Sequence, residues 1–416
     1  MLLAIVLAAN LTFDFPAVQV GVAEYEQGPT GATIFYFPKT AKVAVDVRGG
    51  APATIETDGL RLAYDEPYVD AISFAGGSSY GLAAATGAAH ELKARNAAGG
   101  DWGSIASVPG AIIFDLGGRR YNTIVPDFDL GRAALRNVKA GEFPLGPRGA
   151  GRFAMQGGYY GDEGRQHSGQ GGAFRQVGAT KIAVFTVVNA LGAVVDRGGN
   201  IVRCNEEPCG RIADKLAKRT RVAAGPDDAH PTEATTLTLV VTNQKLPFWA
   251  LQRLAIHVHT SMARAIQPFH TTRDGDVLFA ASTDEIENES LSVADLGVIA
   301  SEVAWDAVLA SVPPREVDDR PVIAVPESAL QPHTGRYELA PAVIATVTRE
   351  GAQLYLEVSK GSIYLPEKQR VALQPLSATE FRIPGVRRDR VRFERDGMTI
   401  NPGLWPLRGK RVMNAF

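Results

Sequence analysis

The sequence predicts an α/β protein with a small all-β domain at its C-terminal end. Apolar runs typical of strands alternate with alanine-rich runs typical of helices as far as residue 312. The content of 43 glycines and 25 prolines favours a turn-rich α/β protein over a helical bundle. After Pro313-Pro314 the pattern changes to short alternating strands, and a length of 416 residues suits one large and one small domain.

The elements of the first domain, placed at 10–314, follow from apolar periodicity and β-branched content. A glycine-rich turn, Gly76-Gly77-Ser78-Ser79, joins its first clear strand to a helix with apolar residues on one face. In chain order, the predicted elements are a strand at 71–75, a helix at 80–95, strands at 182–188 and 235–242, and helices at 247–266 and 293–312.

The second domain is predicted at 331–416, after an extended linker at 315–330 that begins just beyond the two prolines. The pair Asp396-Gly397 is a strong hairpin signal. Short alternating strands are predicted at 335–339, 343–348, 353–358, 370–373, 380–383 and 390–394. The aromatic residues of these strands are expected to form the core of the domain: Tyr337, Tyr355, Phe381 and Phe393.

Composition narrows the choice of partners. With 45% hydrophobic and 21% charged residues, the chain has the composition of an ordinary globular protein. Its formal net charge of -2 gives no electrostatic reason to expect nucleic acid or an anionic membrane surface as a partner. Small polar or zwitterionic substrates therefore remain the expected ligands.

Two local features bear on the compartment of the protein. The apolar run Met1 to Ala9 is about half as long as a membrane span, and it fits either the tail of a signal peptide or a short first strand. Cys204 and Cys209 lie in a loop-like segment, where the sequence leaves open a disulfide or two free thiols. Together these features favour, weakly, a periplasmic or secreted protein.

No motif for a metal or a nucleotide cofactor is present. The chain lacks H-E-x-x-H, a Walker loop and a G-x-G-x-x-G after a strand. His257 and His259 lie two apart on a predicted helix, so they point to different faces and cannot bind one metal together. We therefore expect no cofactor.

One alternative catalytic motif involves Ser79. The segment Gly77-Ser78-Ser79-Tyr80-Gly81 fits G-x-S-x-G and lies between a predicted strand and helix, as a nucleophile elbow does. A glycine-rich turn at this place is also a common way to pack a helix closely or to aim amides at a ligand. Ser79 is kept as a minor candidate for a serine-hydrolase nucleophile.

The strongest catalytic candidate is Thr235, which begins a buried apolar strand. A threonine hydroxyl is a poor nucleophile at neutral pH and needs a base beside it. If the peptide bond before Thr235 breaks, its own amine, with a pKa near about 8, supplies that base. Asp274 and Asp276, which flank a single glycine further along the chain, are suited to hold the amine and hydroxyl in place.

Motifs spread over residues 11–312 resemble the self-processing aminopeptidase family of L-aminopeptidase/D-Ala-esterase, β-peptidyl aminopeptidases and nylon-oligomer hydrolases. The match covers most of the first domain and keeps one order. Its segments are Phe13-Asp14-Phe15-Pro16, the run from Val43 to Pro52, Gly76-Gly77-Ser78 with Tyr80-Gly81-Leu82, Val108-Pro109, Ile113-Phe114-Asp115-Leu116, Val187-Val188-Asn189, Leu191-Gly192, Thr235-Thr236, His270-Thr271 and Asp274-Gly275-Asp276.

The resemblance implies an αββα-layered fold and cleavage of the chain between Ala234 and Thr235. Thr235 then becomes the N-terminal nucleophile, and the paired aspartates of the family fall on Asp274 and Asp276. The active-site asparagine of the family falls on Asn189, whose amide is suited to stabilise an oxyanion. Gly76, Gly77 and Ser78 are expected to line the same pocket.

The chain departs from the family at two places. The residue before the nucleophile is usually asparagine or glycine in the family and is Ala234 here. The threonine members carry an active-site lysine upstream of the asparagine strand, whereas residues 152–180 contain no lysine. Tyr159, Tyr160 and Arg165 lie near its place, and an arginine supplies the charge of a lysine but not its basicity.

The expected function is that of an aminopeptidase or amidohydrolase without a metal, assembled as a homo-oligomer of cleaved fragment pairs that spans no membrane. Three alternatives remain: an acyltransferase on the same fold, an unprocessed inactive binding protein, and the Ser79 hydrolase. The C-terminal strands resemble a small lipocalin-like barrel found after some serine hydrolases, on segments such as Gly335-Arg336-Tyr337-Glu338. Such a barrel is expected to cover the mouth of the active site or to build an oligomer interface.

Overall fold

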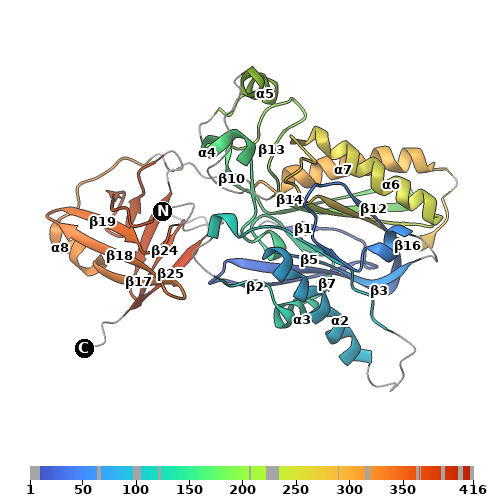
Figure 1. The fold of residues 1–416 in the computed structure, drawn as a ribbon, viewed down its shortest axis with the longest axis horizontal. Coiled ribbons are helices and arrows are strands. Elements are labelled where there is room, and N and C mark those ends of the chain that lie inside the picture. The colour runs from blue at the N-terminus through green and yellow to red at the C-terminus, as the bar shows by residue number, and fades with distance from the viewer. Residues whose placement is uncertain are drawn as a thin grey trace.

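The computed structural model describes residues 10–62, 67–96, 105–119, 123–205, 208–221, 234–288, 290–313, 318, 320–361, 365, 367–385, 389–401 and 406–412. The apolar run Met1 to Ala9 lies outside this set. The described chain forms a large α/β domain and an antiparallel β domain beside it (Figure 1).

One ten-stranded sheet is the frame of the large domain. Its strands are β2 (Gln19–Tyr25), β3 (Thr30–Val47), β4 (Thr54–Ile55), β5 (Tyr68–Ala75), β6 (Gly110–Ile112), β7 (Lys139–Ala140), β11 (Gln170–Val177), β12 (Thr180–Asn189), β14 (Thr235–Gln244) and β16 (Val277–Ile286). They run in the order β11-β12-β14-β16-β3-β5-β6-β4, and β2 pairs with both β3 and β7. Strand β14 therefore lies inside the sheet, antiparallel to β12 and parallel to β16.

The sheet folds over on itself at β3. The first part of this long strand pairs with β2 and β5, and its last part pairs with β16. The register shifts between Tyr36 and Ala41, where Thr40 has a φ of 60°. Phenylalanine rings from the two halves meet in the space between them. Centroids of Phe35 and Phe185 lie 5.2 Å apart. Burial of aromatic surface here joins the two halves.

Helices cover both outer faces of the folded sheet (Figure 1). On one face α6 (Phe248–Ser261) and α7 (Val293–Ala310) pack on β11, β12, β14 and β16, and on the other lie α2 (Ala83–Asn96) and α3 (Phe128–Arg136). Helices α2 and α3 approach closely through glycines. A Cβ at Gly87 would lie 2.0 Å from the carbonyl oxygen of Phe128. The layers run helix, sheet, sheet, helix, which confirms the predicted αββα architecture.

The remaining elements of the large domain are short. They are β1 (Asn10–Thr12), β8 (Glu142–Pro144), β9 (Met155–Gln156), β10 (Gln166–His167), β13 (Ala193–Val194), β15 (Ile266–Gln267), α1 (Asp58–Leu62), α4 (Gly161–Gly164) and α5 (Ile212–Arg221). Helix α4 and strand β10 lie on the side of the domain that faces the C-terminal barrel (Figure 1). This side also carries the candidate active site described below.

Nine antiparallel strands form a nearly closed barrel at the C-terminal end. They are β17 (Gly335–Ala340), β18 (Val343–Glu350), β19 (Gln353–Val358), β20 (Val371–Ala372), β21 (Gln374–Pro375), β22 (Glu380–Arg382), β23 (Arg390–Glu394), β24 (Gly397–Ile400) and β25 (Leu407–Val412). Their order is β20-β19-β18-β17-β25-β24-β23-β22-β21. The predicted small β domain is confirmed, and the expected hairpin joins β23 to β24.

Three details of the C-terminal prediction are corrected. Helix α8 (Glu327–Leu330) occupies the end of the stretch expected to be an extended linker, because Leu330 is buried in the core of the barrel. Tyr337, Phe381 and Phe393 are core residues as predicted. Tyr355 is only half-buried, with the guanidinium of Arg370 3.7 Å from its ring centroid. Strands β21, β24 and β25 were not predicted.

The barrel is joined to the large domain by packing and by charge. Arg152, which is 3% exposed, donates to the carboxylate of Glu26 at 3.4 Å and to the carbonyl oxygen of Pro406 in the barrel at 3.3 Å. Arg408 of β25 donates to the same Glu26 at 2.9 Å. Phe153, from the large domain, belongs to the hydrophobic core of the barrel.

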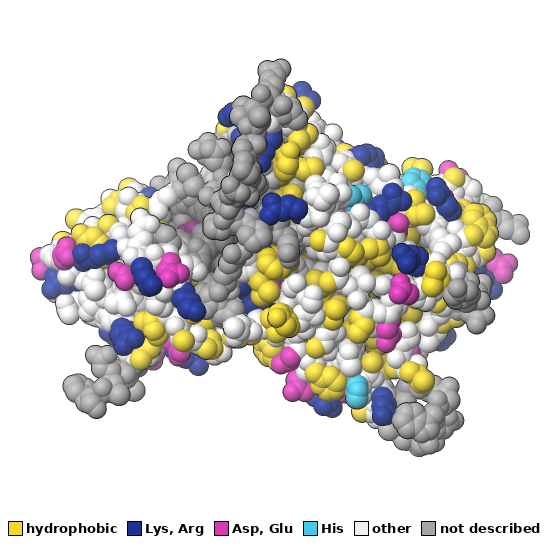
Figure 2. All heavy atoms as spheres, in the orientation of Figure 1, with side chains coloured by type: hydrophobic (Ala, Val, Ile, Leu, Met, Phe, Trp, Pro, Cys, Tyr) yellow, Lys and Arg dark blue, Asp and Glu magenta, His cyan; other side chains and the backbone are white. Residues whose placement is uncertain are grey.

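The surface agrees with the near-neutral composition. On the face shown in Figure 2, acidic and basic side chains lie interspersed, with no large area of one sign. No helix within the described ranges is long and apolar enough to cross a bilayer.

Candidate active site

The predicted nucleophile and the predicted asparagine meet at one end of two neighbouring strands. Thr235 is the first residue of β14, and its register partner on β12 is Asn189, the last residue of that strand. The two residues are 3% and 4% exposed. Because side chains alternate along a strand, both lie on the face that carries Leu237 and Val187, which is the space between the two halves of the sheet. The site therefore sits at one end of the inter-sheet core.

The hydroxyl of Thr235 lies against the peptide bond expected to break. Its Oγ1 donates to the carbonyl oxygen of Ala234 at 2.6 Å, across an uncleaved link. The main chain before the link is paired as well, since the N–H of Ala234 donates to the carbonyl oxygen of Arg273 at 3.0 Å. The nucleophile and its first target are thus in contact and fixed on both sides.

Asp276 is tied to the backbone just after the nucleophile. Its Oδ1 accepts the N–H of Thr236 at 2.7 Å, and its Oδ2 accepts from the backbone N–H of His270 at 3.2 Å. The ring Nδ1 of His270 lies 3.0 Å from the same oxygen. The side chain is 0% exposed, so the carboxylate depends on these contacts for its solvation.

Asp274 is held on the other side of the junction. Its Oδ2 accepts the backbone N–H of Thr271 at 2.9 Å and the hydroxyl of Thr271 at 2.5 Å, and its Oδ1 accepts the N–H of Leu191 at 3.2 Å. Burial raises the pKa of the Asp274 carboxyl above its ordinary value, and the nearby charge of Asp276 raises it further. In the uncleaved chain the Asp276 carboxylate thus holds the main chain just after Thr235, and the Asp274 carboxylate holds Thr271 and Leu191. The hydroxyl of Thr235 bonds to Ala234 and to neither aspartate.

The side-chain amide of Asn189 is fixed by two hydrogen bonds. Its Oδ1 accepts the N–H of Met155 at 3.0 Å, and its Nδ2 donates to the carbonyl oxygen of Phe114 at 3.0 Å. An amide nitrogen has two N–H groups, so one of them is left for a substrate oxygen. This arrangement orients the amide before any substrate arrives.

A pocket opens beside the junction. It encloses 440 Å³ of space, part of it open solvent, and Asn189 and Ala234 are in its wall. The other described residues that line it are Phe114, Asp115, Gly117, Phe153, Met155, Gln156, Gly158, Arg165, Ala190 and Leu191. Most of this wall is apolar, with a guanidinium and a few polar groups, as is common for small-molecule sites.

The turn at Gly76 to Ser78 has a different place from the one expected. These residues are not among the described residues that line the pocket. Their N–H groups donate within the protein, to the carbonyl oxygens of Gly31 and Ile113 and, from Gly77, to the carboxylate of Asp115 at 2.8 Å. Gly77 has a φ of 80°, which suits glycine. The turn thus supports the pocket through Asp115, and a direct contact with substrate remains a prediction.

Asp115, which lines the pocket, forms a buried ion pair with Arg119. Their atoms lie 2.9 Å apart, and both side chains are 0% exposed. Asp115 also accepts the hydroxyl of Thr30 at 2.6 Å. The sequence alone predicts no role for Asp115, which belongs to a segment that resembles the family. Its position shows that it braces the wall.

Arg165 is one of three residues expected near the place of the lysine missing from this chain. It lines the pocket, whereas Tyr159 and Tyr160 are not among the described lining residues. The hydroxyl of Tyr160 donates to the carbonyl oxygen of Gln267 at 3.1 Å, and the ring of Tyr159 lies under Arg219. The pocket therefore has a permanent cation near the junction and no lysine among its described lining residues.

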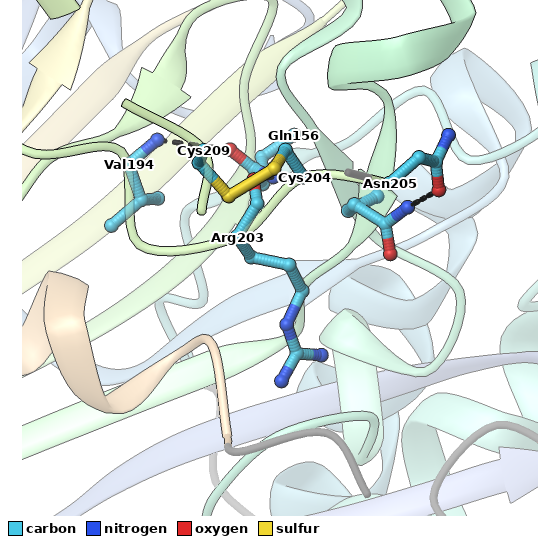
Figure 3. Close-up of a disulfide and its surroundings, with 7 residues drawn as sticks. Gln156, Val194, Arg203, Cys204, Asn205 and Cys209 are labelled. Carbon is cyan, nitrogen blue, oxygen red and sulfur yellow. Dashed lines mark hydrogen bonds between the residues drawn. A yellow bond between two sulfur atoms is a disulfide. The ribbon is translucent and has the colours of Figure 1, made fainter. Parts of the chain in front are cut away.

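Cys204 and Cys209 form a disulfide, so the choice left open by the sequence is settled (Figure 3). The loop that they close lies behind Gln156 of the pocket wall. Gln156 donates to the carbonyl oxygen of Arg203 at 3.3 Å and accepts the N–H of Val194 at 2.9 Å. The disulfide loop thereby supports one side of the pocket.

His257 and His259 point to different sides of helix α6, as their spacing predicts. His259 is buried, and its Nδ1 lies 2.8 Å from Asp46, whereas the ring of His257 faces Gly297 on α7. Burial lowers the pKa of His259 below the ordinary value, although its bond to Asp46 acts in the opposite direction. Within the described part of the chain, no group of three or more His, Cys, Asp or Glu residues could hold a metal ion.

Ser79 lacks the partners of a serine-hydrolase nucleophile. Its side chain is exposed, on a short 3₁₀ helix at Ser78–Leu82. Among the hydrogen bonds of the described residues, none joins Ser79 to a histidine. The elbow hypothesis has no support from this geometry.

Known proteins similar to this chain include hydrolases of amide bonds. A sequence model described as peptidase family S58 matches residues 10–316. A 6-aminohexanoate-oligomer endohydrolase from Paenarthrobacter ureafaciens is 41% identical over 311 residues, which cover 72% of this chain and 85% of that protein. An uncharacterized aminopeptidase from Mycobacterium tuberculosis is 34% identical over 315 residues, which cover 71% of this chain and 88% of that protein.

Solved structures show the same fold at low sequence identity. A Burkholderia sp. β-aminopeptidase superposes with a TM-score of 0.51 at 16% identity, covering 74% of this chain and 89% of that one. An L-aminopeptidase D-Ala-esterase/amidase from Ochrobactrum anthropi, described as a variant of the Ntn hydrolase fold, gives a TM-score of 0.51 at 17% identity. That match covers 71% of this chain and 82% of the other.

Proposed function

The chain belongs to peptidase family S58, and from that premise we propose that it cuts itself between Ala234 and Thr235 and then uses Thr235 as an N-terminal nucleophile. As a member of this family it is a hydrolase of peptide or amide bonds. The cut frees the amine of Thr235. Its pKa of about 8 lets it accept the hydroxyl proton at neutral pH. No metal takes part in the proposed reaction.

Each turnover then proceeds through an ester on Thr235. The hydroxyl oxygen attacks the carbonyl carbon of the substrate, the leaving amine takes up the proton, and water hydrolyses the ester. The free N–H of Asn189 is placed to stabilise the oxyanion, a contact worth about 3 to 4 kcal/mol in comparable enzymes. The Asp276 carboxylate holds the main chain just after Thr235, and a parallel backbone bridge joins Asp274 to Ala234 just before it, which supports the position of the amine and hydroxyl.

One observation carries this proposal. Thr235 stands directly opposite Asn189 in the sheet, with its hydroxyl 2.6 Å from the carbonyl oxygen of Ala234, and both Asn189 and Ala234 line the pocket. Packing alone does not require a hydroxyl, a fixed side-chain amide and two buried carboxylates to gather around one peptide bond.

The substrate class follows from the relatives and from the pocket. One relative is named as a 6-aminohexanoate-oligomer endohydrolase and another as an aminopeptidase. The largely apolar wall around Phe114, Phe153 and Leu191 suits a hydrocarbon chain next to the reacting amide. We therefore propose short peptides, amino-acid amides and linear ω-amino amides as substrates, and a homo-oligomer of cleaved pairs as the active form.

The first experiment compares three freshly purified proteins by intact mass and N-terminal sequencing: wild type, Thr235→Ala and Thr236→Val. Thr236 is the matched control because it lies next to the nucleophile on the same buried strand, and its hydroxyl has no hydrogen-bond partner. We expect a fragment beginning at Thr235 from wild type and from Thr236→Val, and a whole chain of 44.3 kDa from Thr235→Ala.

Three outcomes separate this proposal from its alternatives. A wild-type chain that stays whole would reject self-cleavage and favour the inactive binding protein, for which the change to Ala234 supplies a reason. An acyltransferase would pass the acyl group to an added amine such as hydroxylamine in preference to water. Loss of activity in Ser79→Ala with cleavage intact would instead support the Ser79 hydrolase.

A further inference from the structure

The carbonyl group of the junction has a second hydrogen-bond donor besides the nucleophile. The backbone N–H of Gly275 donates to the carbonyl oxygen of Ala234 at 2.7 Å. This donor comes from the residue between the two site aspartates, far along the chain from Ala234. The bond points at the oxygen that would carry the negative charge while the junction is cleaved.

The position of Gly275 is fixed from several directions. Ala234 and Asp274 form a parallel bridge that extends the pairing of β14 with β16. On the other side, the N–H of Ala51 donates to the carbonyl oxygen of Asp274 at 2.9 Å. The flanking carboxylates are themselves anchored, Asp276 to the N–H of Thr236 and Asp274 to the N–H of Leu191. The amide of Gly275 therefore cannot turn away without breaking this local network.

The nucleophile leaves no room for a side chain at this position. A Cβ added at Gly275 would lie 2.6 Å from Oγ1 of Thr235 and 2.7 Å from the carbonyl oxygen of Ala51. Such distances are well inside van der Waals contact. Glycine here brings the backbone amide and the reacting hydroxyl to the same carbonyl group, which a larger residue would prevent.

From this geometry we infer that the Gly275 amide is the oxyanion donor for self-cleavage, an assignment that rests on the proposed function. Oγ1 of Thr235 attacks the carbonyl carbon of Ala234, and the carbonyl oxygen becomes an oxyanion that the Gly275 N–H stabilises. The bond from carbon to the Thr235 nitrogen then breaks, and the hydroxyl proton ends on that nitrogen as a free amine. Water hydrolyses the resulting ester, which restores the hydroxyl and leaves a carboxylate on Ala234.

The inference also gives the paired aspartates a shared task. The Asp276 carboxylate holds the main chain just after the junction, the Asp274 carboxylate holds Thr271 and Leu191, and Gly275 between them carries the donor. The main task of Asp274 and Asp276 is therefore to hold the Gly275 amide in place, and proton transfer is secondary. Asp274 and Asp276 act here as positioning residues for the Gly275 N–H.

The test replaces a single N–H by oxygen. Glycolic acid introduced at position 275 by nonsense suppression in cell-free translation converts the donor amide into an ester and adds no atoms next to Thr235. The matched control carries glycolic acid at Gly178, an exposed turn glycine with nothing within 4 Å of its Cβ position. Cleavage of the labelled chain is followed by gel over time, and trypsin resistance compared with Thr235→Ala reports the fold.

The oxyanion role predicts that the 275 ester slows cleavage by about 100- to 1000-fold while the 178 ester cleaves at the wild-type rate. Cleavage of the 275 ester within tenfold of wild type would overturn the assignment but leave Thr235 as the nucleophile. A wild-type chain that stays whole would overturn the proposed function and this inference together.

A second measurement does not depend on how the ester variant folds. In the whole Thr235→Ala protein, labelled with ¹³C and ¹⁵N, the hydrogen bond should give a through-bond coupling between the Gly275 nitrogen and the Ala234 carbonyl carbon. The pairs between β12 and β14 provide the internal reference. A spectrum that shows the reference couplings without this one would reject the inference.

Discussion

Phe153 links the active-site pocket to the C-terminal barrel, and replacing it with alanine tests whether the two domains act as one structure. The ring is 1% exposed, lines the pocket and belongs to the hydrophobic core of the barrel. It also meets the ring of His167 edge-on, at a centroid distance of 5.0 Å. Truncation thus removes a buried ring that both domains contact.

The expected loss of stability is about 3 to 5 kcal/mol, the usual range for Phe→Ala in a packed core. The matched control is Phe143→Ala, which removes a ring that is 0% exposed in the inter-sheet core, 4.9 Å from the centroid of Phe185. Phe143 lies outside both the core of the barrel and the described pocket wall. The two variants should therefore lose similar stability, and only Phe153→Ala should change substrate binding.

The assay combines urea unfolding, followed by circular dichroism, with steady-state hydrolysis of an amino-acid amide. We expect Phe153→Ala to raise KM through the widened pocket, and Phe143→Ala to leave KM unchanged at temperatures where both are folded. A stability loss below about 1 kcal/mol for Phe153→Ala would contradict the packing argument. Equal KM values for the two variants would contradict the link between barrel and pocket.

Three further outcomes are expected. Asp115→Ala should lower the free energy of unfolding by about 3 to 5 kcal/mol, since it leaves a buried guanidinium without its carboxylate, and a loss under about 1 kcal/mol in urea would refute this. Burial raises the pKa of Asp274, so its ionisation opposes folding. In a Thr235→Ala background, unfolding titrations at several pH values compare the chain that keeps Asp274 with Asp274→Asn. The free energy of unfolding of the chain with Asp274 should fall relative to that of Asp274→Asn as pH rises from about 4 toward the raised pKa, and a parallel pH dependence of the two would contradict this expectation. Replacing Cys204 and Cys209 with serine should cost about 2 kcal/mol, measured as a lower urea midpoint that reducing agent no longer changes; wild-type stability in the double variant would exclude this role.

Strands β5, β12 and β14 and helices α2, α6 and α7 could be predicted because their sequences are consistent at every level, whereas strands β3 and β16 and helix α3 were not predicted. Strand β14 is rich in β-branched residues and buried along its whole length, so its apolar run was readable without tertiary information. Strands β24 and β25 could not be read in this way. Glycine starts β24, and charged residues alternate through β25, where pairing within the barrel outweighs local preference.

The residues expected at the site lie close together in the structure, but their contacts could not be predicted. Resemblance to a family gave Thr235, Asn189 and the paired aspartates, whereas the register that sets Asn189 opposite Thr235 depends on long-range pairing. Taken alone, the stretch around Gly275 reads as a solvated turn, yet Asp276 is 0% exposed. Phe153 carried no local signal either, because its role comes from a barrel that begins far along the chain.

The interior position of β14 bears on whether the proposed cleavage comes before or after assembly of the sheet. The strand is paired on both sides, with β12 through eight register positions from Thr235 to Thr242 and with β16 on the other edge. A break just before its first residue leaves these ladders in place, so the two fragments stay together without a covalent bond. A fragment made separately would have to insert its first strand between two neighbours that, without it, have reason to close on each other. If the chain cleaves itself as proposed, the link between Ala234 and Thr235 would therefore serve assembly and become dispensable afterwards.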